Sequence, residues 1–240
     1  MGVTNSVTES AALLDGTVMK DLLRHDRGQL DLRELSSEQG VLDQSDGSAR
    51  FNHGQTSVIA SVVGPVEAPL RLELVDRAAV SVVVKSLPSW APSSVAELEL
   101  LVRQTLEPIV LRAMHPRTQI AITLHIVEDA GSLLAACVNA ACLALVDAGV
   151  PCSAMATGVS FAISRSGNVL LDPTLDEEHS SPVRMTFVFS TADQNMLTSA
   201  TDGLISEDAY FKCAEVARQG AARVQAFTEL TLRSKVNSKP

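Results

Sequence analysis

The amino-acid sequence predicts an α+β fold in which mixed β-sheets pack in layers against helices. Three observations point to this class. Hydrophobic residues make up 46% of the 240 residues, which is enough for a large core in a chain of this length. Strand-like segments precede helix-like segments in both halves, so the alternation typical of a doubly wound sheet is absent. One helical segment, residues 133–148, is apolar on nearly every side, as expected of a helix inside a core.

The first structured half is predicted to span residues 24–151, after a flexible N-terminal arm over residues 1–23. Alternating or β-branched residues predict strands over residues 41–51, 56–63, 79–85 and 118–127. Helical spacing of apolar residues predicts helices over 95–114 and 133–148. Pro108 is expected to kink the first of these helices or to shorten its hydrogen-bond ladder.

The second half is predicted to span residues 152–240 and to pack on the first. Strands are expected over residues 154–164, 168–171, 183–190 and 195–200. A last helix is expected over residues 206–233, because Ser206 can cap its first turn and two acidic residues follow.

Composition excludes several function classes. The formal net charge is −9, which argues against coating nucleic acid by bulk charge but permits a local basic path. Aromatic residues are only 3%, so a base-stacking platform is not expected. No apolar run is long enough to span a membrane. The four cysteines form no CxxC pair, and no zinc site is predicted.

The turn before the central helix is the first candidate site. Gly131 allows close backbone approach, and Ser132 places a hydroxyl where the helix begins. A helix N-terminus offers unpaired N–H groups to an anion such as phosphate. The alternative is that Asp129 or Ser132 only caps the helix.

Two further features leave alternatives open. Arg103 has Glu99 and Glu107 at helical spacing, so it could form surface ion pairs or face a phosphate. The acidic run of residues 172–178 could hold Mg²⁺ or supply a general acid, or it could be a solvated loop.

Short motifs occur in a fixed order over most of the chain. They are RHDR at 24–27 with Arg33, DGSA at 46–49, GQTSVI at 54–59, GPVE at 64–67, PRTQI at 116–120, and DAGS at 129–132 continuing to DAGVP at 147–151. Together these segments resemble the ribonuclease PH family, and the run at residues 129–135 most resembles that of a ring subunit of the eukaryotic RNA exosome.

This resemblance implies roles for individual residues. Phosphate would be held by Arg103, Ser132 and Gly131, but Leu133 stands where active members carry an arginine. Asp172 and Glu178 match a pair of acidic catalytic residues, the second of which is usually aspartate. Loss of one preorganised cationic donor costs roughly 10²–10³ in rate, so we expect a crippled or silent phosphorolytic site.

The expected function is therefore that of a ring subunit of the RNA exosome. The subunit would help to guide single-stranded RNA, and Lys85 and Arg117 would contact that RNA. Other ribonuclease PH-like subunits would be its partners, in the nucleus, nucleolus and cytoplasm. Two alternatives stay open. The chain could be a 3′→5′ exoribonuclease that uses inorganic phosphate, or a homodimeric nuclease that hydrolyses RNA or DNA with Mg²⁺.

Overall fold

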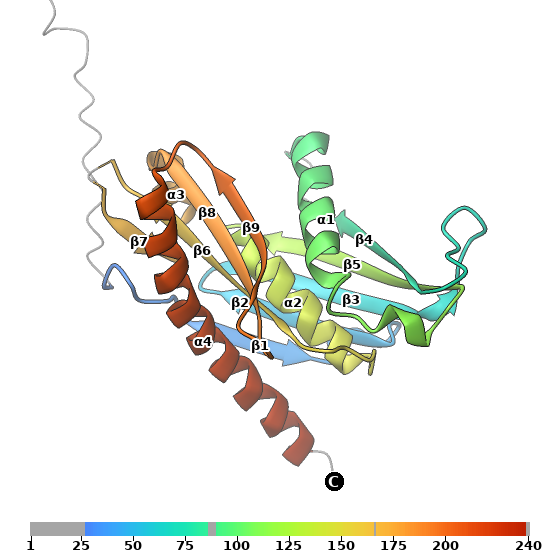
Figure 1. Cartoon of the computed structure of the whole chain (residues 1–240). Helices are drawn as coiled ribbons and strands as arrows, with labels where there is room; N and C mark the ends of the chain where they lie inside the picture. The colour runs from blue at the N-terminus through green and yellow to red at the C-terminus, as the bar shows by residue number, and fades with distance from the viewer. Residues whose placement is uncertain (1–26, 86–89, 166, 239–240) are drawn as a thin grey trace, which may run out of the picture.

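A computed structural model describes residues 27–85, 90–165 and 167–238 (Figure 1). The predicted arm at 1–23 and the motif residues 24–26 lie outside the described residues. Two β-sheets sandwich a central helix, and further helices flank them, so the predicted α+β class is confirmed. No helix within the described ranges has the length and hydropathy that a membrane span requires.

The first sheet has five strands in the order β1-β2-β3-β5-β4. All neighbours are antiparallel except β4 and β5, which run parallel. Alternation of buried and exposed side chains places one face of this sheet against the core. The bounds are β1 Leu35–Gln39, β2 Gly47–His53, β3 Thr56–Glu67, β4 Ala79–Lys85 and β5 Thr118–Glu128.

Two details of this sheet differ from the prediction. Strand β2 begins at Gly47, six residues later than expected, because residues 43–46 form a turn before it. Strand β1 was not predicted, since its sequence LSSEQ is mostly polar. It is the edge strand of the sheet, and its register along β2 rather than its own propensity defines it.

Helix α1 spans Pro92–Leu106 and is shorter than the predicted 95–114. Proline is favourable in its first turn because the N–H missing there would be unpaired anyway. Pro108 lacks the N–H that would continue the ladder, so the helix stops just before it. A separate 3₁₀ turn, η1, follows at Arg112–Met114.

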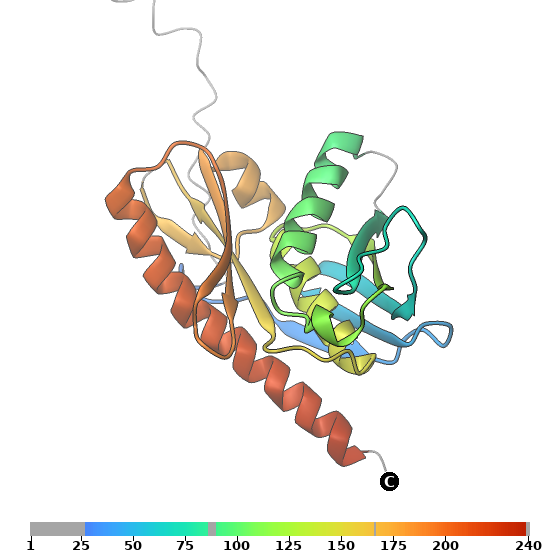
Figure 2. The same ribbon diagram turned by 45° about the vertical axis from the view of Figure 1, so that its right-hand side comes forward.

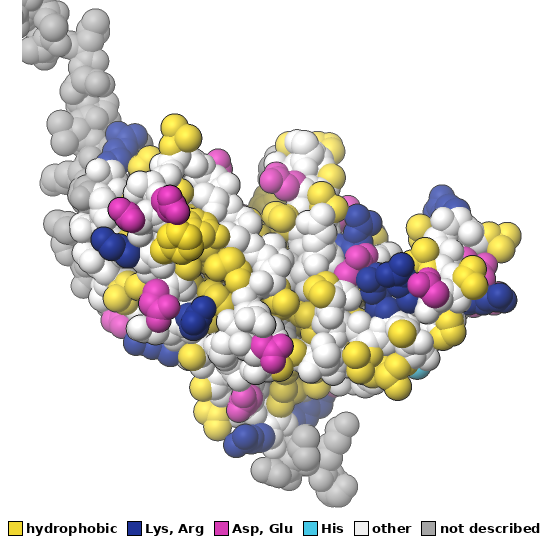
Figure 3. Space-filling view, viewed as in Figure 1, with side chains coloured by type: hydrophobic (Ala, Val, Ile, Leu, Met, Phe, Trp, Pro, Cys, Tyr) yellow, Lys and Arg dark blue, Asp and Glu magenta, His cyan; other side chains and the backbone are white. Residues whose placement is uncertain are grey.

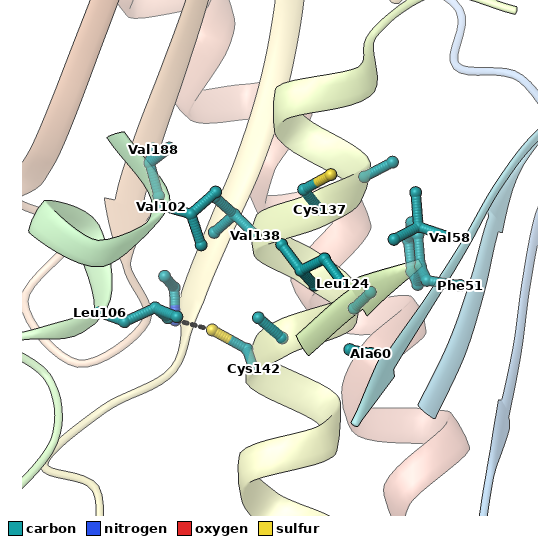
Figure 4. Packing of buried hydrophobic residues seen from close by; sticks show 14 of the residues in the cluster. Phe51, Val58, Ala60, Val102, Leu106, Leu124, Cys137, Val138, Cys142 and Val188 are labelled. Carbon is teal, nitrogen blue, oxygen red and sulfur yellow. Dashed lines mark hydrogen bonds between the residues drawn. The ribbon is translucent and has the colours of Figure 1, made fainter. Parts of the chain in front are cut away.

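Helix α2, Leu133–Asp147, lies between the two sheets, and every residue from Ala135 to Leu145 is buried. Figure 4 shows Cys137 and Val138 of this helix between Val58 of the first sheet and Val188 of the second. The one polar side chain in this stretch, Asn139, exchanges two hydrogen bonds with the backbone of Gly158. The prediction of a core helix is confirmed.

The second sheet has the order β7-β6-β8-β9 and is antiparallel throughout. Helix α4 runs along its outer side and continues beyond it (Figure 2). The bounds are β6 Ala156–Ile163, β7 Val169–Leu171, α3 Leu175–Ser180, β8 Val183–Ser190, β9 Met196–Asp202 and α4 Glu207–Ser238.

Helix α3 corrects the interpretation of the acidic run as a solvated loop. Thr174 and Glu177 form a capping box, in which the threonine hydroxyl accepts from the Glu177 N–H and the glutamate accepts from the Thr174 N–H. The acidic residues fill the first turn of this helix, where negative charge is favourable.

Candidate functional site

The fold brings four of the predicted site residues to one place. Gly131 and Ser132 are the last residues of the β5–α2 connection. Asp172 lies shortly before helix α3, and Glu178 lies within that helix. Gly131 has φ +98°, and a Cβ there would lie 2.6 Å from the backbone of residues 173, 174 and 175. The close approach that this glycine permits is therefore to the chain's own backbone, and its expected part in holding phosphate gains no support from this geometry.

Asp172 is the centre of a buried hydrogen-bond cluster. Its carboxylate accepts from the Arg33 N–H at 2.7 Å, from Arg33 Nη2 at 2.7 Å and from Ser132 Oγ at 2.9 Å. Arg27 Nη1 donates to it at 3.3 Å, and His53 Nε2 lies 3.0 Å from Oδ2. We call Arg27, Arg33, His53, Ser132 and Asp172 the Asp172 cluster.

Arg33 joins this cluster to the 131 turn. Its guanidinium also donates to the carbonyls of Ala130 at 2.9 Å and Gly131 at 3.0 Å. Thr56 Oγ1 donates to the same Gly131 carbonyl at 2.6 Å. Each of these bonds joins residues far apart in the sequence, so the cluster ties the N-terminal segment to both sheets.

The protonation state of Asp172 follows from these partners. Burial by itself raises its pKa, but the side chains of His53 and Arg33 outweigh burial and hold the pKa far below its ordinary value. A general acid must carry a proton at the working pH. The expectation that Asp172 acts as an acid therefore gains no support from its surroundings.

Ser132 is the N-cap residue of α2, but its side chain makes no capping hydrogen bond, so the alternative that it only caps the helix is not supported. It adopts a left-handed conformation with φ 59°, and its hydroxyl donates to Asp172 and to the Pro173 carbonyl rather than accepting from the helix. Asp172 is also left-handed, with φ 54°. Such conformations cost about 1–3 kcal/mol each, and the hydrogen bonds of the Asp172 cluster hold them in place.

Glu178 occupies the position where an anion would meet the N-terminus of α2. Its Oε1 accepts from the Ser132 N–H at 2.7 Å. Burial raises its pKa, the Ser132 N–H lowers it, and the nearby charge of Asp129 raises it, with a net upward shift. Of the two predicted acids, Glu178 is the one whose environment favours a proton.

Beyond Glu178 the molecule is hollowed between α1, the start of α2 and strand β8. The hollow has a volume of about 300 Å³. Its walls are mainly apolar and carry two carboxylates and one guanidinium. The residues that line it are Trp90, Ser94, Glu97, Leu98, Leu101, Leu133, Leu134, Ser160, Phe161, Glu178, Arg184, Met185 and Thr186.

Arg103 does not reach this hollow. It lies two residues after Leu101, so it is rotated by about 200° around the helix from that lining residue. Glu99, one turn before it, accepts from the Val84 N–H of β4, and Glu107 pairs with Arg112 at 3.6 Å. Arg103 is exposed on that outer flank, so its expected role as a phosphate ligand gains no support from its position.

Lys85 and Arg117 lie at opposite ends of the first sheet. Lys85 pairs with His125 at one end of β5, whereas Arg117 immediately precedes β5 at the other. Eight residues of extended chain separate these positions by about 26 Å. Both side chains are exposed, and Arg117 lies 3.7 Å from Glu73.

The acidic pair does not fit Mg²⁺. Both oxygens of Asp172 already accept from arginine, and one oxygen of Glu178 accepts from a backbone N–H. Across the described ranges, no group of three or more histidine, cysteine, aspartate or glutamate side chains could hold a metal ion.

Sequence reasoning did not assign roles to Arg27, Arg33, His53, Thr56 and Arg184. A signal existed for Arg27, Arg33 and Thr56, because they stand inside motif segments that carried the family resemblance. No local pattern marked His53 or Arg184. His53 lies against Asp172, more than a hundred positions away, and Arg184 of β8 pairs with Asp202 of the neighbouring strand β9.

Comparison with known proteins gives consistent matches over both halves. Domain 1 of the 3′ exoribonuclease family matches residues 31–151, and domain 2 matches residues 154–220. The rice protein "Exosome complex exonuclease RRP46 homolog" is 31% identical over 84% of this chain and 92% of its own length. The Saccharomyces cerevisiae "Exosome complex component RRP46" is 32% identical over 77% of this chain and 89% of its own length.

The crystal structure of rice Rrp46 has a TM-score of 0.82 to this chain at 32% identity, covering 87% of this chain and 98% of that one. An archaeal exosome core has a TM-score of 0.74 at 21% identity, over 85% of this chain and 89% of that one, and it shares the fold.

Proposed function

This chain belongs to the 3′ exoribonuclease family, the ribonuclease PH family, and from that premise we propose that it is a ring subunit of an RNA exosome. In this role it assembles with other ribonuclease PH-like subunits and guides single-stranded RNA toward 3′→5′ processing and degradation. The observation that supports this role is that relatives named as exosome components align over 89% or more of their own length. We place the complex in the nucleus, nucleolus and cytoplasm.

We further propose that the phosphorolytic site of this subunit is degenerate. Phosphorolysis brings a phosphate against an anionic phosphodiester, so cationic donors must offset the repulsion. At the 131 turn, Leu133 supplies an aliphatic side chain, and the Ser132 N–H is already bound by Glu178. Inorganic phosphate is the co-substrate expected of an active member of this family, and in this hollow it would meet two carboxylates against one guanidinium.

A product assay tests the degenerate site. Purified protein is incubated with labelled single-stranded RNA, with phosphate, with Mg²⁺ alone and with EDTA. We expect no nucleoside diphosphates and no nucleoside monophosphates. Phosphate-dependent diphosphates that disappear in Glu178→Gln would refute the proposal. Metal-dependent monophosphates would instead support hydrolysis.

The variant Leu133→Arg tests whether the turn is an inherited phosphate site. An added guanidinium beside Ser132 should raise phosphate-dependent product, since one preorganised donor is worth roughly 10²–10³ in rate. Leu133→Met is the matched control, because it changes shape without adding charge. Equal product from the two variants would contradict an inherited site.

Assembly and RNA guidance are tested separately. The chain is expected to co-elute with other ribonuclease PH-like exosome subunits rather than to persist as a homodimer. In the assembled ring, Lys85→Glu and Arg117→Glu should weaken RNA retention and flatten its salt dependence. Unchanged retention in both variants would place the RNA path elsewhere.

One observation favours a second candidate, slow 3′→5′ exonuclease activity. Glu178 is the partly buried carboxyl group with a raised pKa beside the helix N-terminus, which is the environment of a general acid. The same product assay with Glu178→Gln decides this candidate.

A further inference from the structure

The hollow beside Leu133 continues into a second depression and forms a groove. The second depression has a volume of about 310 Å³ and shares Glu97, Leu101, Arg184, Met185 and Thr186 with the first. It extends to Ala200, Thr201 and Asp202 of β9. We call the two depressions together the α1–β9 groove. Figure 3 shows the molecule hollowed between α1 and the second sheet.

The shape of the groove follows from how α1 meets β9. Near its C-terminal end α1 contacts the strand, where the hydroxyls of Thr105 and Thr198 lie 2.8 Å apart. The part of α1 that carries Glu97 and Leu101 borders the groove instead. Strand β9 ends its sheet, so among the described strands only β8 pairs with it. Its outer backbone groups can pair with an added extended segment.

The inner wall of the groove is apolar. Trp90, Leu98, Leu133, Phe161 and Met185 supply most of it. At about 300 Å³ the deeper depression is at the lower limit of cavities that bury small ligands. It therefore suits one large apolar side chain better than a complete nucleotide.

The rim of the groove is acidic. Glu97, Glu178 and Asp202 face one guanidinium, that of Arg184, and Arg184 is already paired with Asp202. Arg184 is the one lysine or arginine among the residues that line the two depressions. The whole chain carries a formal charge of −9. A polyanion such as RNA is repelled by this arrangement, whereas a cationic partner is attracted.

We propose that the α1–β9 groove binds a short extended peptide segment of a partner protein, with a large apolar side chain flanked by arginine or lysine. The apolar side chain fills the depression at Trp90 and Leu133, the basic side chains lie along the acidic rim at Glu97, and the peptide backbone runs along β9. The proposal deepens the proposed function, because a subunit that does not hold phosphate here can use the same hollow for protein recognition.

The chain contains a built-in reporter for this test, because Trp90 is its single tryptophan and lines the groove. The full chain is titrated with a fluorescein-labelled heptapeptide that has a central leucine and an arginine on each side. The same peptide with glutamates in place of the arginines, and a single-stranded oligouridylate, are the comparison probes. The fluorescence anisotropy of the labelled peptide reports binding, and a change in Trp90 emission reports that the peptide binds in the groove.

We expect the basic peptide alone to bind and to shift Trp90 emission. Glu97→Gln should weaken binding about two- to five-fold, the usual worth of a rim charge. Leu101→Lys should weaken it by more than about tenfold, because it places a like charge in the apolar wall. Both positions are at least partly exposed, so the fold should tolerate the changes. Glu229→Gln on α4, outside the groove, should have no effect.

Three results would overturn the proposal. The first is no binding of the basic peptide, and the second is basic-peptide binding that neither Glu97→Gln nor Leu101→Lys weakens. The third is oligouridylate binding that shifts Trp90 emission, which would make the groove an RNA site. The proposed function fails on other readouts, namely product release and co-elution, so the two failures are distinguishable.

Discussion

The two sides of the turn at Gly131–Leu133 differ in charge balance and in how far their polar groups already have hydrogen-bond partners. On one side, the Asp172 cluster buries a carboxylate that accepts from Arg27, Arg33 and Ser132 and lies 3.0 Å from His53 Nε2. On the other, the α1–β9 groove presents apolar walls and excess carboxylates. The Asp172 cluster therefore connects segments of the chain to one another, whereas the α1–β9 groove offers an accessible surface to a ligand.

This difference shows why charged residues near a family site need not be catalytic. A buried carboxylate that is held by several charged partners rigidifies the chain, and losing one partner leaves an uncompensated charge. A partly exposed carboxyl group such as Glu178, in contrast, can exchange its partner for a ligand. Four sets of substitutions test this difference.

The largest expected effect is on the Asp172 cluster. Asp172→Asn removes the negative charge between Arg27 and Arg33, so we expect a loss of about 3–5 kcal/mol in the free energy of unfolding. Urea denaturation followed by circular dichroism measures it. Asp176→Asn, an exposed change in the first turn of α3, should cost less than about 1 kcal/mol. Equal costs for the two variants would contradict a structural role for Asp172.

Gly131→Ala should be the next most destabilising change. A Cβ there meets backbone atoms at 2.6 Å and the residue has positive φ, so overpacking and strain together predict a loss of about 2–4 kcal/mol. Gly149→Ala is the matched control, because its φ is +69° but a Cβ would meet nothing within 4 Å. The difference between the melting temperatures of the two variants measures the effect of the close contact with the backbone of residues 173–175. Similar melting temperatures would contradict a destabilising contact there.

The two carboxyl groups should respond to pH in opposite directions. The folded-state pKa of Asp172 is lowered, so its stabilisation is present above its unfolded pKa of about 3.9 and is lost as the pH falls toward the folded value. The pKa of Glu178 is raised, so its contribution is present below about 4.3 and is lost as the pH rises through the folded value.

We therefore compare the stability of Glu178→Gln with that of the unchanged protein at two pH values. The difference in favour of the variant should be larger at pH 7 than at pH 4. Urea midpoints at the two values measure this. A gain at pH 4 that disappears at pH 7 would reverse the assignment.

The smallest effect is expected for Arg103→Ala. Because Arg103 is exposed on the flank of α1 away from the groove, stability should stay within about 0.5 kcal/mol and Trp90 emission should not change. Leu101→Ala, on the groove side of the same helix, should alter the emission. A change for Arg103→Ala as large as that for Leu101→Ala would place Arg103 in the groove.

Local patterns were sufficient for most of the fold. Strands 79–85 and 183–190 were predicted with the bounds observed, because their β-branched or apolar patterns begin and end sharply. Helix α2 was predicted within one residue, since Gly149 and Pro151 mark its end. Strand β1 and helix α3 were missed, because the register along β2 and a capping box define them rather than hydrophobic periodicity.

Sequence patterns were enough to predict the α+β class, the buried central helix, and the two segments, 131–132 and 172–178, whose residues meet at the candidate site. The partners of each residue there became clear only in the folded chain. Spacing along one helix could not show that Arg103 faces away from Leu133, nor could any local pattern show that Glu178 binds the Ser132 N–H. The physical reason is range: periodicity reports which side of an element is buried, whereas the partners of Asp172 and Glu178 lie between 40 and 145 positions away along the chain.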